Sequence, residues 1–457
     1  MPNMTTFDLT REFIDSLREL IDHHDEKAVL ALLDDLHPAD IAEIYGELDL
    51  DEAKYIYFLL DDDTAADVLT ELPEDDKLRF LESLPSEVIA KRFIDKMDSD
   101  DAADVLGQLD SSTQQEVLSH IEDIEVAGDI ADLLTYDEHT AGGIMAKELI
   151  KVRDSWNMNT CIRSMRQQAE EVDEVYYVYV VDSRDVLKGT LSLKRLLLSP
   201  EDIQIRDILN EDVISVRVDT STDEVSNIMD KYGLVALPVV DGVGRLVGRI
   251  TIDDVVDVMR EEAEKDYQLA SGITEDVEIS DSVWIHTRAR IPWLLIGLLG
   301  GVLGSRVIGG FIGILGEHPH LALFMPLIGA MGGNVGIQSS AIVVQSLASG
   351  SMGLDTNWGK LVKELTIAFL NATVLSLIMF GYNYIVDAGW PLSLTVSAAM
   401  FSVVVFASMF GTFVPLLLKR INIDPAVATG PFVTTLNDII GMFIYLTFGA
   451  LFYALLL

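Results

Sequence analysis

One carboxylate lies inside an otherwise apolar stretch near the end of the chain. The segment GPFVTTLNDIIGM covers residues 430–442, and Asp438 is the only acidic or basic side chain in residues 426–457. A charge at mid-bilayer costs about 2.5–3.5 kcal/mol even on a lenient insertion scale, so such a residue usually faces a bundle interior or a water-filled path. Because Gly430, Thr434 and Asp438 are spaced by four, they share one helical face. We predict that this face lines a path for a cation.

A second polar pair interrupts another apolar stretch. The segment AMGGNVGIQSS, residues 330–340, places Asn334 and Gln338 four residues apart on one helical face. Hydrocarbon would leave their amide groups without hydrogen-bond partners, so this face must meet protein or water. We therefore predict that Asn334 faces the ion together with Gly430, Thr434 and Asp438.

The chemistry of these side chains favours a hard divalent cation. Mg²⁺ demands octahedral oxygen ligation and gives up its water reluctantly, and the hydrated ion is about 7 Å across. A wide ring of acceptors around one or two carboxylates could hold that ion through its waters. The apolar stretches contain neither cysteine nor clustered histidine, which argues against a soft-metal site.

The composition of the chain separates a soluble part from a membrane part. Residues 1–140 contain 39 Asp and Glu against 9 Lys and Arg, whereas residues 284–457 contain 6 and 7. About 20 apolar residues span a bilayer, and five stretches are long enough: Ile291–Ile314, Leu321–Leu347, Leu361–Val386, Leu392–Leu418 and Ala426–Leu456. Their basic flanks all fall on the side of the soluble part. The positive-inside rule therefore predicts a multi-pass protein of the cytoplasmic membrane, with its N-terminus cytoplasmic and its C-terminus extracellular.

The acidic soluble part restricts the partners of the protein. Nucleic acid is not expected to bind, because phosphate contacts need a basic face, whereas cations are natural partners of a chain with net charge −42. From residue 7 to residue 134, apolar residues recur every three and four positions, which predicts helices throughout. The motif AADVL at residues 65–69 returns at residues 102–106, which indicates a small superhelical array.

In residues 137–262 the sequence pattern differs and predicts short strands that are rich in β-branched and aromatic residues. Two such units lie in tandem, and the motif PVVDGVGRLVGRITIDDV at residues 238–255 resembles the CBS domain, a module usually paired for regulation. In that family a hydroxyl and a nearby carboxylate often hold an adenosine ribose, which would here be Thr251 and Asp254. The first unit has Arg195 where the carboxylate is needed. ATP binding thus remains open at the second unit and is not expected at the first.

Three motifs together resemble the MgtE family of magnesium channels. They are PLIGAMGGNVGIQSSA at residues 326–341, DPAVATGPFVTTLNDIIG at residues 424–441 and HTAGGIM at residues 139–145. The resemblance covers nearly the whole chain and implies a multidomain membrane protein in five parts. These are an all-α superhelical N domain (residues 1–136), two α/β CBS domains (137–200 and 201–258), a connecting plug helix (259–283) and an α-helical transmembrane pore domain of five helices (284–457).

The resemblance also implies a mechanism. It predicts a homodimer that takes up Mg²⁺ through a pore lined by the second and fifth spans, and that closes when Mg²⁺ binds among the N domain, the CBS domains and the plug. Asp424, at the inner mouth, is the family position that meets the plug. Like charges in one interface repel each other unless a divalent cation bridges them, and such acids cluster around the start of the plug: Asp253, Asp254, Asp257, Glu261 and Glu262.

Other functions are weighed against this one. A divalent-cation exporter coupled to Na⁺ or H⁺ could use Asp438 as an alternating-access site, but it would favour further intramembrane acids or bases, and none is expected deep in the spans. A nucleotide sensor with an anchoring membrane part has no use for Asp438 or Asn334. An enzyme is not expected, because the phosphate-loop-like segment Gly353–Lys360 has the wrong spacing and no Ser or Thr after its Lys.

Overall fold

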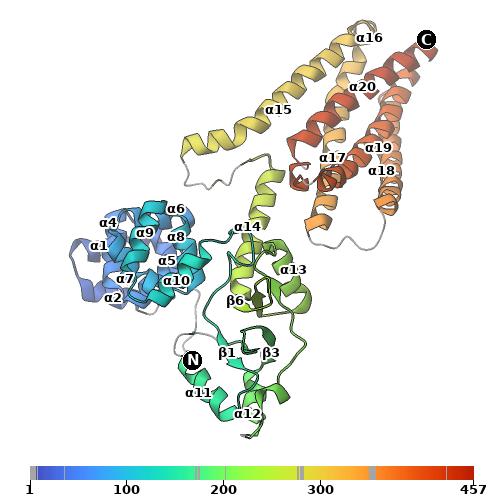
Figure 1. Cartoon of the computed structure of the whole chain (residues 1–457). Coiled ribbons are helices and arrows are strands. Elements are labelled where there is room, and N and C mark those ends of the chain that lie inside the picture. Colours follow the sequence, from blue (N-terminus) through green and yellow to red (C-terminus); the bar gives the residue numbers. More distant parts are fainter. Residues whose placement is uncertain are drawn as a thin grey trace. The chain divides into compact units, whose positions relative to one another are not determined.

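The computed structural model divides the chain into two compact units, Met1–Met259 and Arg260–Leu457. It describes residues 7, 9–34, 36–169, 172, 175–200, 202–274, 277, 282–348, 357–421, 423–428 and 430–456. The segment Gly353–Lys360 lies largely outside these residues, as does part of the predicted plug, residues 259–283. Figure 1 shows the elements of both units in chain order.

The first unit begins with an all-helical region, as its apolar periodicity predicts. Aspartates start several of these helices: Asp61 Oδ1 accepts a hydrogen bond from Thr64 N at 3.0 Å, and Asp110 Oδ1 accepts one from Ser112 N at 3.0 Å. Part of the acidic excess therefore serves to cap helices. The elements are α1 Arg11–Asp22, α2 Glu26–Leu33, α3 Pro38–Tyr45, α4 Leu50–Leu59, α5 Asp62–Thr70, α6 Glu74–Glu82, α7 Ser86–Arg92, η1 Ile94–Lys96, α8 Ser99–Gly107, α9 Ser111–His120 and α10 Ile124–Leu133.

Two similar three-stranded sheets follow, which confirms the two predicted α/β units. In each sheet the first strand pairs in parallel with the second, and the second pairs antiparallel with the third. The first sheet contains β1 Ile150–Arg153, β2 Val178–Val181 and β3 Leu187–Leu191, and the second contains β4 Val216–Arg217, β5 Ala236–Val240 and β6 Leu246–Thr251. The helices among them are α11 Met158–Gln168, α12 Leu193–Leu198, η2 Ile205–Asp207, α13 Thr222–Tyr232 and α14 Ile252–Ala270.

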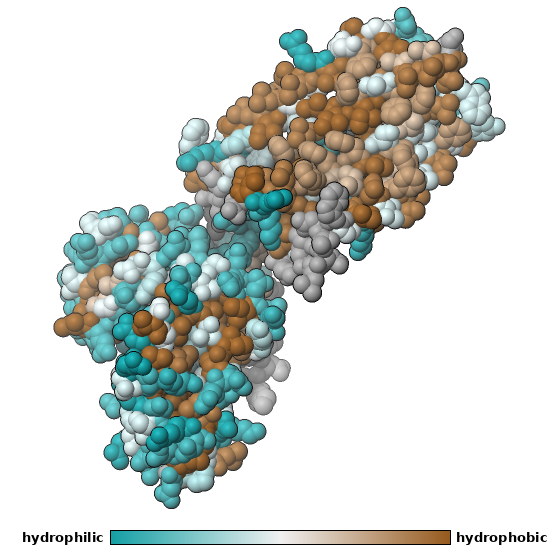
Figure 2. Space-filling model, turned by 45° about the vertical axis from the view of Figure 1, so that its right-hand side comes forward, coloured by the Kyte–Doolittle hydropathy of each residue, from teal (hydrophilic) through white to brown (hydrophobic). Residues whose placement is uncertain are grey.

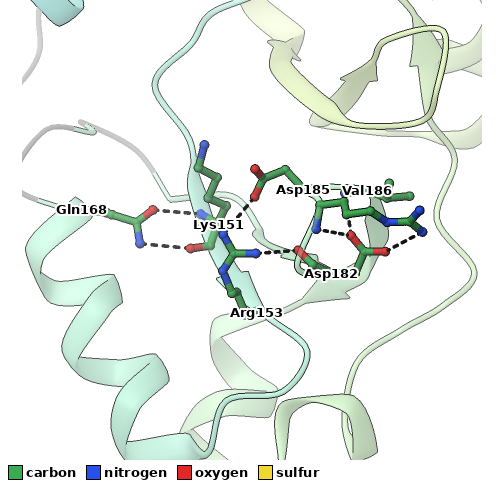
Figure 3. A network of polar contacts seen from close by, with 7 residues as sticks. Lys151, Arg153, Gln168, Asp182, Asp185 and Val186 are labelled. Atoms are coloured by element: carbon green, nitrogen blue, oxygen red, sulfur yellow. Dashed lines mark hydrogen bonds and ion pairs between the residues drawn. The ribbon is translucent and has the colours of Figure 1, made fainter.

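Side chains close the free edge of the first sheet (Figure 3). The Gln168 amide accepts from Lys151 N and donates to Lys151 O, both at 3.0 Å, and so occupies backbone groups of the edge strand β1. Arg153 Nη1 donates to Asp182 O at 2.8 Å, and Arg153 Nη2 lies 3.4 Å from Asp185 Oδ1. The backbone groups of Lys151 are therefore not available to a foreign strand, and the arginine also fixes the turn between β2 and β3.

The segment that enters the CBS pair packs on the second sheet before the chain reaches the first. Ala141 N donates to Thr220 O at 2.7 Å, and Ala146 N donates to Arg249 O at 2.8 Å. A Cβ at Gly143 would lie 2.5 Å from the carbonyl oxygen of Asp137, so only glycine fits there. The buried apolar residues of the helical region and of the second CBS unit form one continuous core, whereas the first CBS unit has its own.

Within its described residues, the second unit contains five helices that are long and apolar enough to cross a membrane, which confirms the five predicted spans. They are α15 Val283–Gly310, α17 Met325–Ala348, α18 Asn357–Ile385, α19 Trp390–Arg420 and α20 Pro431–Leu456, with the short elements α16 Ile312–Glu317, η3 Pro319–Phe324 and η4 Pro425–Ala428. Helix α19 contacts α17, α18 and α20. The surface of this unit is mainly hydrophobic in Figure 2, as a lipid-facing surface must be.

Glycines let some of these helices approach each other closely. A Cβ at Gly411 of α19 would lie 2.4 Å from the carbonyl oxygen of Gly336 of α17, and one at Gly300 of α15 would lie 1.8 Å from Thr435 Cγ2 of α20. Other glycines of α15 are open, since a Cβ at Gly297 or Gly301 would meet no described atom within 4 Å. Close packing therefore involves some glycines of these helices and not others.

Replacing Gly411 by Ala should destabilise the membrane unit, because its methyl group would collide with backbone that cannot rotate away. Overpacking of this kind costs about 1–3 kcal/mol, which should lower the Tm of the detergent-solubilised protein by about 3–8 °C. The matched control is Gly301→Ala, whose methyl group enters open space. Equal melting temperatures of the two variants would contradict the close contact of α17 with α19.

Candidate functional site

A cavity of about 450 Å³ lies between α17 and α20. Three of the four predicted ion-facing residues line it, namely Asn334, Thr434 and Asp438. The remaining lining residues are Met325, Pro326, Gly329, Ala330, Gly333 and Met442. Two apolar helices thus bring a carboxylate, a hydroxyl and an amide to one cavity.

Glycines of α17 make room for the polar face of α20. A Cβ at Gly333 would lie 3.0 Å from Thr434 Cγ2 and 3.6 Å from Asp438 Oδ1, and one at Gly329 would lie 3.7 Å from Asp438 Oδ1. Larger side chains at these two positions would fill the space beside the carboxylate. Both Asp438 and Asn334 are exposed on the single chain, so this face is open to water or to another protein surface.

Gly430 lies elsewhere, against the end of the connecting helix α14. It is buried, and a Cβ there would lie 3.0 Å from the carbonyl oxygen of Ala270. The same joint brings Gly272, at φ +83°, close to Pro431, because a Cβ at Gly272 would lie 2.9 Å from Pro431 Cγ. The structure thus places Gly430 where the connector meets the start of α20, outside the lining of the cavity, and its predicted role toward the ion stays a prediction.

A second membrane carboxylate was missed by sequence analysis. Glu364 of α18 accepts a hydrogen bond through Oε1 from Ser339 Oγ of α17 at 2.7 Å, and a second from Ser408 Oγ of α19. The two serine oxygens are 2.9 Å apart and buried. The expectation of no further acid deep in the spans is therefore wrong, because the Glu364 side chain reaches the interior of the bundle. Its position inside the third predicted span, Leu361–Val386, was the available signal, but its serine partners are distant in sequence.

A cluster of carboxylates lies where the helical region meets the second CBS unit. The N-domain/CBS acid cluster comprises Asp98, Asp100, Asp101, Glu148 and Asp254. Carboxylate oxygens of Asp98, Asp100 and Glu148 lie within 4.8 Å of one another, a spacing that could hold a metal ion. Only Asp254 of this cluster was predicted. Asp98, Asp100 and Asp101 lie at the start of α8 and resemble ordinary capping residues, Glu148 lies in the loop before β1, and only the tertiary fold brings them together.

Burial and mutual repulsion raise pKa values across this cluster. Burial, then the charge of Asp254, raises the pKa of Asp100 well above its ordinary value, and the same two causes raise the pKa of Asp101 to about 7. Burial raises the pKa of Asp254 to about 6, although hydrogen bonds from Thr251 oppose that shift. Since no opposite charge lowers these values enough, the cluster is a site that favours protons or a bound cation.

The predicted nucleotide residues and the other predicted regulatory residues lie at the start of α14, along α14 or just before η4. Asp254 Oδ2 accepts from Thr251 N at 2.9 Å and from Thr251 Oγ1 at 2.6 Å, which caps the start of α14. Of the remaining predicted regulatory acids, Asp253, Asp257 and Glu261 are exposed on α14, and Glu262 is half-buried on the same helix. Asp424 is exposed before η4, and its Oδ1 accepts a hydrogen bond from Ala426 N. The roles of all these residues stay predictions.

Models of known protein families match three stretches of this chain. Family models match at residues 325–448 (divalent cation transporter), 36–139 (MgtE intracellular N domain) and 205–261 (CBS domain). The chain is 33% identical to the magnesium transporter MgtE of Thermus thermophilus over 445 residues, which cover 95% of this chain and 97% of the relative. It is 29% identical to the magnesium transporter MgtE of Bacillus subtilis over 416 residues, covering 91% and 92%.

Among the solved structures that match, two each cover about half of this chain. The crystal structure of the soluble part of a magnesium transporter gives a TM-score of 0.50 at 32% identity, covering 55% of this chain and 98% of its own. The crystal structure of the cytosolic domain of the Mg²⁺ channel MgtE in complex with ATP gives 0.51 at 33% identity, covering 54% and 99%. Similarity that runs from the helical region through the helices around Asp438 shows that this membrane protein belongs to the MgtE family of magnesium transporters.

Proposed function

We propose that the protein mediates Mg²⁺ uptake across the cytoplasmic membrane as a channel whose ion path passes Asp438. The cavity that Asp438 lines carries this proposal, because its volume of about 450 Å³ exceeds the roughly 180 Å³ of a sphere 7 Å across, the size of hydrated Mg²⁺. Asp438, Thr434 and Asn334 would hold the ion through its waters. Such contact avoids the cost of stripping the hydration shell.

A homodimer completes this path in the proposal. Asp438 and Asn334 are exposed on one chain, yet neither a carboxylate nor an amide is stable against hydrocarbon. A second copy facing the same surface would enclose the polar face and double its charge. The N-terminal unit and the basic ends of the spans would then lie in the cytoplasm, as the positive-inside rule requires.

Replacing Asp438 by Asn should reduce Mg²⁺ uptake by roughly tenfold or more, because the side chain keeps its size and loses the charge that concentrates the cation. Uptake into proteoliposomes loaded with a Mg²⁺-sensitive dye measures this effect. The matched control is Asp387→Asn, the same chemical change in the membrane unit at a position with φ 53°, which Asn tolerates well. Undiminished uptake by Asp438→Asn would remove Asp438 from the ion path.

The proposed gate uses the N-domain/CBS acid cluster as a Mg²⁺ sensor. Buried carboxylates with raised pKa values repel each other when ionised, and a divalent cation that bridges them would favour the compact form. Such a cation shifts the equilibrium only because the separated form offers no bridged site. High intracellular Mg²⁺ would thus close the channel, with Asp253, Asp257, Glu261, Glu262 and Asp424 proposed as further ligands toward the connector.

The pH dependence of this contact tests the sensor. The raised pKa values of Asp101 (about 7) and Asp254 (about 6) mean that the folded contact holds more protons than the unfolded chain between about pH 4 and 7. Without Mg²⁺ the contact should lose stability as pH rises through this window. Mg²⁺ must displace the same protons, so its apparent affinity should be roughly tenfold or more weaker at pH 5.5 than at pH 7.5.

Protease half-life of the helical region in the full chain measures both trends. Without Mg²⁺ we expect a longer half-life at pH 5.5 than at pH 7.5, and saturating Mg²⁺ should remove this difference, because the bound ion replaces the protons at both pH values. Asp101→Asn should flatten both dependences, whereas Glu43→Gln, at an exposed acid on α3, should leave them unchanged. If Asp101→Asn keeps the wild-type pH dependence and Mg²⁺ midpoint, the sensor is not at this cluster.

One observation favours the alternative of a coupled exporter. Coupling needs intramembrane groups that exchange protons or ions, and Glu364 lies in the bundle with two serine hydroxyls on its carboxylate. In the channel proposal these contacts only hold α17, α18 and α19 together. Glu364→Gln should then leave the pH dependence of Mg²⁺ flux unchanged, even where it alters stability. Loss of a Na⁺ or proton requirement in this variant, measured in proteoliposomes with imposed gradients, would support the exporter instead.

ATP is proposed only at the second CBS unit, because Thr251 and Asp254 lie there. The solved cytosolic domain of an Mg²⁺ channel MgtE in complex with ATP supports nucleotide binding in general and does not locate the site. Thr251 donates hydrogen bonds to the Asp254 carboxylate, so a ribose hydroxyl would have to share or replace these hydrogen bonds. Because Asp254 also belongs to the acid cluster, a nucleotide bound there would act on the same surface as Mg²⁺.

A further inference from the structure

A second cavity, of about 520 Å³, lies at the joint between the connector and the membrane helices. The turn Ser271–Ile273 after α14 and Pro431 at the start of α20 form one side of it. Arg290, Trp293, Leu294 and Gly297 of α15 form the other. The cavity is separate from the one around Asp438, since the two share no lining residue.

Two nitrogen-bearing side chains at this cavity, Arg290 and Trp293, can only donate hydrogen bonds. Arg290 is exposed, its Nη2 lies 3.4 Å from His286 Nδ1, and no described carboxylate lies within ion-pair distance of it. Trp293 is only 7% exposed, yet its indole Nε1–H has no acceptor among the described residues. Buried N–H groups are seldom left without a partner, so a missing acceptor is expected here. A guanidinium and an indole N–H together suit an anionic oxygen.

The rest of the cavity is apolar and continues onto the bare face of α15. Leu294 is 67% exposed and Leu298 is 62% exposed, as side chains that contact lipid would be. A Cβ at Gly297 would meet no described atom within 4 Å, so the missing side chain leaves space beside these leucines. A ligand for this cavity must therefore combine an anionic head with an apolar tail.

We propose that the cavity binds an anionic phospholipid, with its phosphate at Arg290 and Trp293 and the upper part of an acyl chain beside Gly297. Basic pockets between membrane helices select such headgroups, and tryptophan favours the headgroup level. A zwitterionic lipid offers the same tail with no net charge, so it matches the donors less well. The site concerns the lipid around the protein and does not depend on which ion is transported.

The position of this site gives the lipid a role beyond solvation. Thr274 N and Thr274 Oγ1 donate to Ala289 O at 3.1 and 3.0 Å, which ties the end of the connector to α15 next to Arg290. Pro431, on the opposite side, contacts Gly272 and begins the helix that carries Asp438. A lipid held between these elements braces the connector against α20.

Binding is measured on the purified full-length protein. We expect phosphatidylglycerol to raise the Tm and to remain bound in native mass spectrometry, with phosphatidylcholine doing so at least about fivefold more weakly. Arg290→Gln should remove the preference for phosphatidylglycerol. Gly297→Leu, whose side chain begins in open space, should displace the lipid by filling the acyl channel. The matched controls are Gly301→Leu, one turn further along α15 and equally open, and Arg420→Gln, at the end of α19.

Each other outcome overturns the proposal. Equal retention of the two lipids, or wild-type retention by both Arg290→Gln and Gly297→Leu, means that no lipid site exists here. An equal rise in Tm with inorganic phosphate alone identifies a free-anion site instead. A change from dimer to monomer in Gly297→Leu, with lipid retention unchanged, assigns the groove to a second copy of the chain. Circular dichroism and the elution volume show whether each variant is folded, and the two independent variants keep the test decisive if one is not.

Discussion

An ionised carboxylate that is removed from bulk water without a positively charged partner raises the free energy of the folded protein, and a bound cation offsets that cost. This protein has such carboxylates in two places. At Asp438 the surroundings are apolar helices. In the N-domain/CBS acid cluster they are other carboxylates, and burial raises the pKa values of Asp100, Asp101 and Asp254. In the proposed function both sites bind the same kind of ligand, a divalent ion, and one passes it on whereas the other retains it.

Close helix packing is what makes the membrane site possible. Backbone contact at Gly336 and Gly411 brings α17 and α19 together, and small residues at Gly329 and Gly333 leave space beside Asp438. Without a hydrophobic driving force between helices in lipid, such close contact is a main source of association. Glycines of α17 thus have two roles, since Gly336 packs against α19 and Gly329 and Gly333 leave space beside the carboxylate.

Much of this organisation could be predicted from residue types and spacing. Apolar length defined the five spans, and the isolated charge of Asp438 with Thr434 on one face predicted a shared cavity lining. Gly430 shows the limit of that argument, because helical spacing assigns a face and cannot say where along the helix the cavity ends. Glu364 and Asp100 could not be assigned, since their partners come from elements that only tertiary packing brings near.

The route of the chain through the CBS pair makes the first CBS unit an insertion within another body. The segment around Ala141 and Ala146 joins the second sheet, the chain then leaves to build the first unit, and it returns at β4 to the same sheet. The first unit has its own core, while the helical region and the second unit share one. A module placed in this way can change in length or content while the surface that brings Asp98, Asp100 and Asp254 together keeps its own packing.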